Sequence, residues 1–185
     1  MQKNKENIWI FQIRTAPKLP LKQKLPLMKW LPNMIPRALS PDQLPSLVGT
    51  ELGRSAWREI PQALIDDFAA VNGDDQWIHV DTVRAAQERG GTIAHAFLVL
   101  SLMSAMTREI ARYEGVKHGF NYGFDQLRFT SPVPSGARIR LIENLVSAEP
   151  RPTGLLIRRN CVVEVENQDR PAVVGDWLIL LVTAA

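Results

Sequence analysis

The sequence predicts an α+β domain in which an antiparallel sheet wraps around one long, buried helix. Helical periodicity extends from His95 to about Tyr113, and the part of it from Phe97 to Met106 is apolar nearly all round. A helix with so wide an apolar surface must be buried on most sides. Strand patterns separated by turn residues follow it, over 119–129, 137–147, 155–166 and 173–183. One buried helix followed by consecutive strands favours a sheet that curves around that helix.

The elements before the long helix are shorter and mostly helical. Those we expect are a helix from Ser40 to about Val48, a short strand over 54–60, a helix from Pro61 through Ala70, and a loop with a short helix over 75–89. Serine is a favoured helix cap and proline suits the first helical position, so Ser40–Pro41 and Pro61 are predicted as helix starts. Asn72–Gly73–Asp74 has the residue types of a turn and closes the second of these helices.

Charge divides the chain into two unequal parts. Residues 1–40 contain eight lysines and arginines and a single acid, Glu6, which gives a net charge of +7. The remaining 14 basic and 18 acidic residues leave 41–185 at −4, so the overall charge of +3 comes from the N-terminal part. Prolines interrupt any long helix in that part. We therefore predict a basic, proline-rich extension over 1–40 and one folded domain over 41–185, whose charge gives no support to nucleic-acid binding.

Composition excludes several other classes of protein. The single cysteine, Cys161, rules out a disulfide framework and a cysteine-rich metal cluster, and it indicates a reducing, cytoplasmic setting. We expect Cys161 to pack in the core together with Val163 and Val165, which share its face of a strand. No stretch approaches the ~20 consecutive apolar residues of a membrane span. The three histidines show no metal-ligand spacing, so we expect no metal site.

The segment that carries the most chemistry follows the helix expected to end near Ala70. Asp74 and His79 stand five residues apart in a loop, and Gly90–Gly91 precedes the long helix. A carboxylate and an imidazole at close range can hold and activate one water molecule. The N–H groups at the start of a buried helix can stabilise negative charge on an oxygen. Spacing alone favours structural roles, with Asp74 as a turn residue and His79 as a buried, hydrogen-bonded histidine.

Two neighbouring segments resemble the signature of the MaoC-like dehydratase family, and in particular its nodulation-protein-N-like branch. The first reads Gly73-Asp74-Asp75-Gln76-Trp77-Ile78-His79-Val80-Asp81, and the second reads Ile93-Ala94-His95-Ala96. Further similarity to that branch is found at 121–129, 132–138 and 163–166, so the resemblance covers about residues 40–183. It implies the hot-dog fold, an antiparallel sheet wrapped around a long central helix.

The resemblance implies that Asp74 and His79 are the catalytic pair of an (R)-specific enoyl-CoA hydratase, a lyase of fatty acid metabolism. They would bind the water that adds to C3 of a trans-2-enoyl thioester, and the reverse reaction would dehydrate a (3R)-3-hydroxyacyl thioester. The backbone N–H near His95–Ala96 would hold the thioester oxygen. Glycine is usual at position 96 in the family. Alanine keeps the backbone donor but adds a methyl group, which either crowds the thioester or leaves the site unchanged.

Three polar side chains are further candidates for substrate binding. Gln76 occupies a position where the family often has asparagine, and it is expected to orient His79 or the substrate. The resemblance places Ser101 or Ser104 near the water or the acyl chain. Serines within helices also bond to backbone carbonyls, which is the structural alternative for both.

The implied substrate carries its own CoA or acyl-carrier arm, so we expect no cofactor and no metal ion. Hot-dog proteins of this type usually form dimers whose sheets join, so we also expect a homodimer. Two alternatives stay open: a non-catalytic module that binds acyl thioesters, and a thioesterase on the same fold. Release of free CoA identifies a thioesterase, whereas loss of the enoyl double bond identifies a hydratase.

Overall fold

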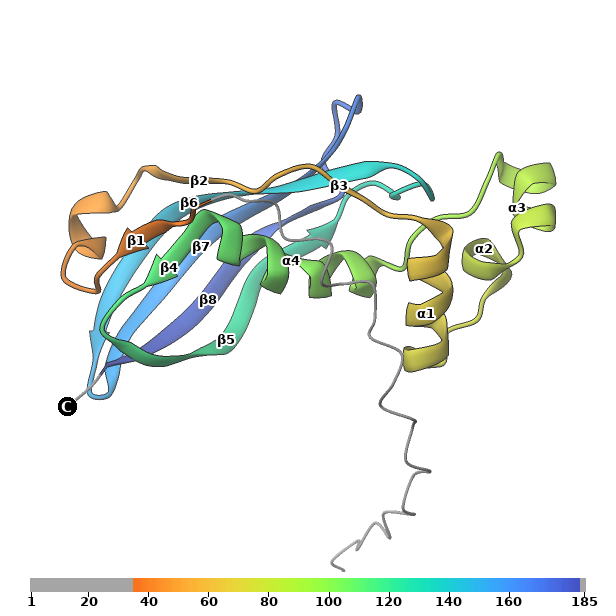
Figure 1. The fold of residues 1–185 in the computed structure, drawn as a ribbon. Coiled ribbons are helices and arrows are strands. Elements are labelled where there is room, and N and C mark those ends of the chain that lie inside the picture. Colours follow the sequence, from red (N-terminus) through yellow and green to blue (C-terminus); the bar gives the residue numbers. More distant parts are fainter. Residues whose placement is uncertain (1–34, 184–185) are drawn as a thin grey trace, which may run out of the picture. The chain divides into compact units, whose positions relative to one another are not determined.

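The computed structural model of the chain describes residues 35–183. Six strands form one antiparallel sheet in the order β2–β6–β7–β8–β5, with β3 also paired to β6. Their bounds are β2 Glu51–Arg54, β3 Arg58–Glu59, β5 Val116–Phe129, β6 Arg138–Arg151, β7 Gly154–Val165 and β8 Val173–Thr183. Figure 1 shows the long strands curving around one side of helix α4 (Ala96–Ile110). The predicted arrangement, an antiparallel sheet wrapped around a long helix, is confirmed.

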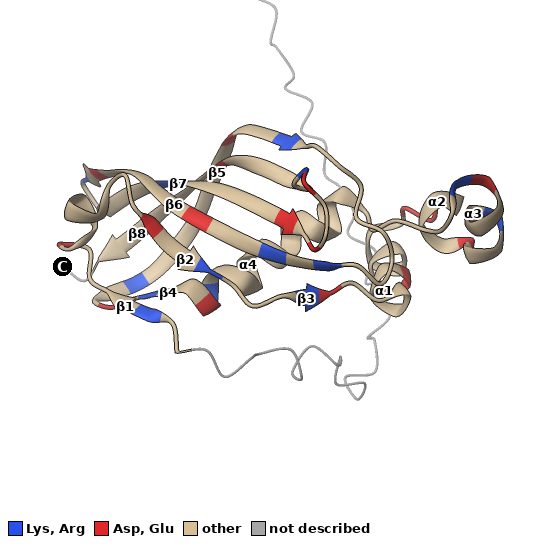
Figure 2. Ribbon diagram, turned by 90° about the horizontal axis from the view of Figure 1, so that it is seen from above, with Lys and Arg blue, Asp and Glu red and all other residues tan. Residues whose placement is uncertain are grey.

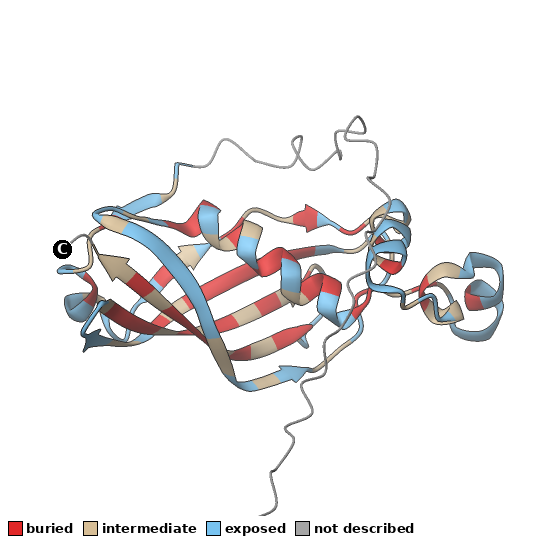
Figure 3. Ribbon diagram, turned by 90° about the horizontal axis from the view of Figure 1, so that it is seen from below, coloured by how far each residue is buried: buried red, intermediate tan, exposed pale blue. Residues whose placement is uncertain are grey.

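The core lies between the sheet and the side of α4 that faces it (Figure 3). The helix contributes six buried apolar residues that recur at helical spacing, namely Leu98, Val99, Leu102, Met103, Met106 and Ile110. Strand β7 contributes alternate residues, as a strand with one buried face does. Cys161, Val163 and Val165 are among them, so the prediction that these three share a buried face is confirmed.

Helix α4 packs against the sheet, as predicted, but one side of it is exposed. Phe97 is 66 % exposed, and Ser101, Ser104 and Arg108 continue the exposed line at helical spacing. Figure 3 shows the same exposure along β5, the edge strand, in which none of the 14 residues is buried. The physical reason is that the sheet covers only one side of the helix.

The long helix is also shorter than its sequence pattern predicts. It ends at Ile110, and the next three residues form β4 (Ala111–Tyr113), which pairs in parallel with β1 (Arg37–Leu39). Ala111 has an extended backbone, with φ −141° and ψ 144°, and both Ala111 and Leu39 are buried. Strand pairing with a segment so distant in the sequence overrides the local helical pattern.

The two elements expected between residues 40 and 60 differ from those in the structure. A single 3-10 turn, η2 (Leu44–Leu47), replaces the helix expected from Ser40 to Val48, because Pro45 within it has no N–H to donate. The strand expected over 54–60 is divided into β2 and β3. Between them Ser55 bonds to Leu141 through both its hydroxyl and its N–H, at 2.9 Å each, which interrupts the regular ladder.

Three shorter helices lie at the end of the sheet where α4 begins (Figure 1). Helix α1 (Gln62–Asn72) has Pro61 as its N-cap, which confirms the helix predicted to start there. Two helices, α2 (Trp77–Val80) and α3 (Thr82–Arg89), replace the single short helix expected over 75–89. They are separate because the Asp81 carboxylate accepts a hydrogen bond of 3.0 Å from the Arg84 N–H and so caps α3.

Charged residues of both signs are interspersed over the strands (Figure 2). One ion pair joins β6 to β7, Arg140 with Glu164 at 2.6 Å, and a second joins Arg138 of β6 to Glu166, the residue after β7, at 2.9 Å. Within residues 35–183, no helix has the length and apolar character needed to cross a membrane. Most of the basic extension predicted over 1–40 lies outside the described residues, and its boundary with the domain stays a prediction.

Candidate active site

Asp74 is positioned by the turn that ends α1. Gly73 adopts a left-handed backbone with φ 78°, which glycine does without strain, and its N–H donates to Ala69 O at 2.9 Å. The Asp74 N–H then donates to the Asn72 side-chain oxygen at 2.9 Å. These bonds direct the chain away from the helix, so that the half-buried Asp74 lies beside the start of α4.

His79 lies on α2 and is only 7 % exposed. Its Nδ1 lies 2.7 Å from the carbonyl oxygen of Ile93. A carbonyl oxygen can only accept, so Nδ1 carries the proton in this bond. In the neutral ring Nε2 is then the nitrogen with a free lone pair. The fold thus selects the tautomer in which His79 can accept a proton through Nε2.

His95, the residue before α4, holds the Asp74 loop through its side chain. Its Nε2 donates to the backbone oxygen of Asp74 at 2.8 Å, and its ring stacks on that of His79 with 3.8 Å between centroids. The ring of Phe68 also packs against the ring of His95, with 5.2 Å between their centroids. His95 is 2 % exposed, and within the described chain its Nδ1 has no hydrogen-bond partner. One buried ring therefore connects the two residues of the predicted catalytic pair.

Asp74, His79 and His95 are close enough to act on one small molecule. Each offers a side-chain oxygen or nitrogen, and these three atoms lie within 4.8 Å of one another. Two hydrogen bonds of about 2.8 Å to one water span such a distance. The same atom types bind metal ions, but one nitrogen of each histidine is already engaged by a backbone oxygen. A tetrahedral metal ion would need a fourth ligand beyond these three residues.

The three residues face a cavity of about 430 Å³ at the N-terminal end of α4. Its other walls come from the start of α4, the segment after β5 and the start of β8. The residues that line it are Asp74, His79, Ile93–Val99 without Leu98, Phe129–Val133, Ala172 and Val173. Most of these walls are apolar, as is usual for small-molecule sites, and the carboxylate and the two imidazoles are among the few polar groups.

The start of α4 supplies hydrogen-bond donors to this cavity. The first N–H groups of a helix have no partner within it, and the N-cap residue His95 makes no side-chain capping bond. Ala96 and Phe97, the first two helical residues, both line the cavity. Ala96 has a negative φ and is exposed, so its backbone does not require glycine. This end of the helix can stabilise negative charge that develops on an oxygen.

The structure brings Asp74, His79, His95 and Ala96 to one cavity and leaves the other three candidates outside it. Gln76 is exposed, and its backbone oxygen accepts a hydrogen bond from the His79 N–H at 2.9 Å. Ser101 is exposed, and its hydroxyl donates to the backbone oxygen of Leu98 at 2.7 Å. This is the bond within the helix that was named above as the structural alternative to substrate binding. Ser104 lines a second cavity farther along α4.

Two further residues support His79 and were missed from the sequence. The Gln62 side-chain nitrogen donates to the backbone oxygen of His79 at 2.7 Å. The Thr92 hydroxyl donates to the Gln62 side-chain oxygen at 2.5 Å. The two residues are 30 positions apart in the chain and carry no shared pattern. No signal in a single sequence connects them, because the contact exists only after α1 packs beside the Ile93 segment.

Comparison with known proteins gives several curated relatives that the chain matches over most of its length, among them a nodulation protein and a dehydratase. Nodulation protein N from Rhizobium leguminosarum bv. viciae is 42 % identical over 147 residues, which cover 77 % of this chain and 91 % of that protein. The 3-hydroxyacyl-thioester dehydratase Z from Mycobacterium tuberculosis is 38 % identical over 138 residues, which cover 74 % of this chain and 91 % of that protein.

Solved structures agree with these relatives. The R-hydratase PhaJ1 from Pseudomonas aeruginosa, in its unliganded form, superimposes with a TM-score of 0.61 and 26 % identity, covering 74 % of this chain and 83 % of that one. The hot-dog fold is therefore confirmed. The family model described as "MaoC like domain" matches residues 43–159, more than half of the sequence. The chain belongs to the MaoC-like domain family.

Proposed function

We propose that the protein is a hydro-lyase that interconverts trans-2-enoyl-CoA and (3R)-3-hydroxyacyl-CoA. The observation that carries this proposal is the shared cavity of Asp74 and His79, in which a carboxylate oxygen and a ring nitrogen lie within 4.8 Å. The Ile93 carbonyl fixes the His79 tautomer that leaves Nε2 free. Relatives named as a 3-hydroxyacyl-thioester dehydratase and an R-hydratase support the same chemistry.

In the proposed hydration, Asp74 and His79 hold one water molecule between them. The pair removes a proton from the water as its oxygen forms a bond to C3 of the enoyl thioester. The electrons of the double bond move toward the thioester oxygen, and the N–H groups at the start of α4 stabilise the enolate. The pair then delivers a proton to C2. Both groups act on the same water molecule, so the base and acid roles are assigned to the pair.

The proposed reaction transfers protons and one hydroxyl group and leaves the oxidation level of the substrate unchanged. It therefore needs no redox cofactor, and the CoA or acyl-carrier arm belongs to the substrate. We also propose that no metal ion takes part, because the acid–base pair supplies each proton transfer. Activity that survives prolonged treatment with a chelator supports this part of the proposal, and activity restored only by added metal contradicts it.

We further propose that the protein forms a homodimer through the β5 edge. Strand β5 has 14 residues, none of them buried, and among residues 35–183 its backbone is paired only with β8. Exposed edges of this length favour pairing with another chain. Phe97 and Phe129 are 66 % and 42 % exposed, meet edge to face at 5.8 Å between centroids, and line the catalytic cavity. Light scattering tests this assembly: it should give twice the mass of the chain.

The experiment that tests the function follows the enoyl double bond of crotonyl-CoA and of a longer trans-2-enoyl-CoA by absorbance. The proposal predicts loss of the double bond and a (3R)-product by chiral analysis. A thiol reagent in the same assay detects free CoA, whose release would instead identify a thioesterase. Binding of both thioesters without any turnover would identify a non-catalytic acyl-thioester module.

A further inference from the structure

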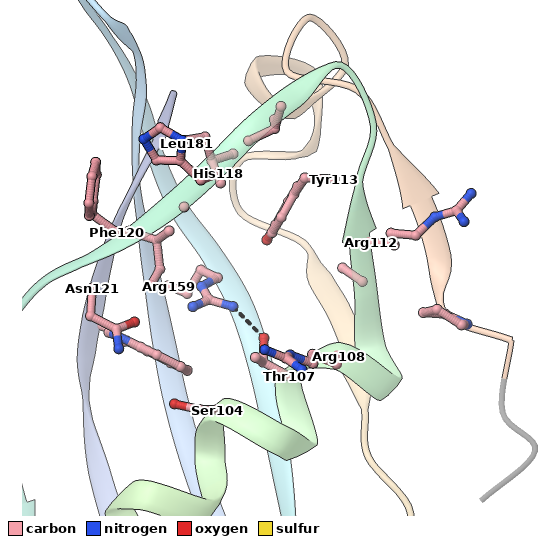
Figure 4. Close-up of a pocket in the computed structure, with 16 residues that line it drawn as sticks. Ser104, Thr107, Arg108, Arg112, Tyr113, His118, Phe120, Asn121, Arg159 and Leu181 are labelled. Atoms are coloured by element: carbon pink, nitrogen blue, oxygen red, sulfur yellow. Dashed lines mark hydrogen bonds between the residues drawn. The ribbon is translucent and has the colours of Figure 1, made fainter. Parts of the chain in front are cut away.

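A second cavity, of about 690 Å³, lies along the C-terminal half of α4 (Figure 4). It is bounded by α4, by β4 and the start of β5, and by inward-facing residues of β7 and β8. None of its lining residues lines the cavity of Asp74 and His79. Along the helix, Ser104 in this cavity is eight residues from Ala96 in the other, or roughly 12 Å.

The floor of this cavity contains a buried arginine. Arg159 is 1 % exposed, on the face of β7 that otherwise carries core residues. Its Nη1 donates to both carboxylate oxygens of the fully buried Glu143, at 2.8 and 2.9 Å. The same nitrogen donates to the Thr107 hydroxyl at 2.7 Å, as Figure 4 shows. Glu143 therefore neutralises Arg159. An ion pair in the core is costly to desolvate and adds little net stability.

Three buried hydrogen-bond donors beside this ion pair have no acceptor within the described chain. They are Nε of Arg159, the hydroxyl of Tyr113 and Nε1 of Trp177, and all three residues line the cavity. The Arg159 guanidinium lies over the Trp177 ring, 4.5 Å from its centroid. Burial raises the pKa of Tyr113, so its hydroxyl keeps its proton and remains a donor. Buried donors are normally paired, so this group favours an acceptor from beyond residues 35–183.

The remaining walls define what else the ligand must carry. Val116, Phe120, Ile179 and Leu181 make much of the lining apolar. Arg108 is exposed at this cavity, and among residues 35–183 it has no ion-pair partner. A cationic group is disfavoured beside it.

We propose that this cavity binds a carboxylate at the end of an apolar chain. A carboxylate accepts several hydrogen bonds at once and so matches a group of donors that lacks acceptors. Its charge is attracted by Arg108, and the apolar chain fits the walls. The ligand is either a free carboxylic acid or the far end of an acyl thioester that reaches the cavity along α4. The proposal goes beyond the hydro-lyase activity and does not depend on it, because binding is measured without turnover.

The test is calorimetric titration of the full-length protein with octanoate, and with octylamine as the cationic counterpart of equal length. The proposal predicts one octanoate site per chain and no binding of octylammonium. Tyr113→Phe removes one donor to a charged group and should weaken octanoate binding roughly tenfold. Arg108→Gln should weaken it and reduce its dependence on salt.

Matched variants control for these effects. The only other tyrosine, Tyr122, is exposed and outside the cavity, so Tyr122→Phe should bind octanoate as the unmodified protein does. Arg89→Gln, on α3, is the control for charge. Near-ultraviolet circular dichroism checks that each variant is folded. The proposal is overturned if octanoate does not bind, or if Tyr113→Phe and Arg108→Gln both bind octanoate as tightly as the unmodified protein does.

Turnover separates the two sources of the carboxylate. A trans-2-enoyl thioester with a terminal carboxylate is compared with its methyl-terminated analogue of equal length. A lower KM for the carboxylated substrate, lost in Tyr113→Phe, identifies the far end of the substrate as the ligand. Equal KM values together with octanoate binding identify a free carboxylic acid. An inactive enzyme that still binds octanoate refutes the hydro-lyase proposal and supports this one.

Discussion

The imidazole rings of His79 and His95 stack with their centroids 3.8 Å apart and an angle of 25° between their planes. His95 also donates to the backbone oxygen of Asp74 at 2.8 Å. One buried side chain thus sets the position of both members of the proposed catalytic pair. His95 acts through those residues, so its contribution is one of positioning.

Substitution of His95 separates these two contacts. His95→Phe keeps a ring for stacking but loses the donor to Asp74, whereas His95→Gln keeps a donor and loses the ring. A displacement of about 1 Å in a catalytic group can cost roughly 100-fold in rate. We expect both variants to lower kcat of enoyl-CoA hydration by about 10- to 100-fold, with a much smaller change in KM. If KM rises in both variants while kcat stays unchanged, His95 would instead be assigned to substrate binding.

Ala96→Gly tests whether the methyl group at the start of α4 affects the reaction. Ala96 is exposed and has a negative φ, so the alanine is unstrained. The backbone donor is the same in both residues. We expect kcat/KM for crotonyl-CoA to stay within a few-fold of the unmodified protein, since glycine costs about 1 kcal/mol of helix stability and little else. A large gain in kcat/KM would show that the methyl group crowds the thioester.

Glu143 is expected to be among the most sensitive positions for stability. Glu143→Leu leaves the buried Arg159 without its counter-charge, which should lower the free energy of unfolding by about 3–5 kcal/mol. The double variant Glu143→Leu with Arg159→Met removes both charges and should recover much of that loss. Glu149→Gln breaks the exposed pair with Arg151 and serves as the control, with an expected change below about 1 kcal/mol. Urea unfolding measures all three.

Cys161 should be unreactive in the folded protein. Burial, reinforced by the charge of Glu143, raises the pKa of its thiol. The protonated thiol therefore favours the folded state. That contribution is fully present below the ordinary thiol pKa of about 8.5 and is lost as the pH rises toward the raised value. A thiol reagent at pH 8 should label the single cysteine only after unfolding, and rapid labelling of the native protein would contradict this.

The elements that could be predicted are those whose pattern is local. The four long strands carry alternating residues bounded by turns, and α1 begins at a proline, so each was recognised with small errors at its ends. The last turn of the long helix could not be predicted, because Ala111–Tyr113 pairs with Arg37–Leu39 far away in the sequence. The exposed side of α4 was missed because an apolar sequence does not reveal how much of a helix the sheet covers.

In the site, too, features with a local sequence pattern could be predicted, and those that depend on distant contacts could not. Asp74, His79, His95 and Ala96 lie in short motifs, and the structure places all four at one cavity. The side-chain role of His95 could not be predicted, because its partner is a backbone oxygen, which every residue type possesses. The floor of the second cavity was missed for a related reason. Arg159 occupies a core position on β7, where the strand pattern predicts an apolar residue.

The most direct test of the central claim is the rate of hydration of crotonyl-CoA by three variants. General acid–base catalysis contributes about 10²- to 10⁴-fold, so Asp74→Asn and His79→Ala should each lose at least about 100-fold in kcat. Asp75→Asn removes the adjacent, exposed carboxylate, which does not line the cavity, and should retain the unmodified rate. Folded Asp74→Asn and His79→Ala proteins that hydrate the substrate as fast as Asp75→Asn would contradict the account.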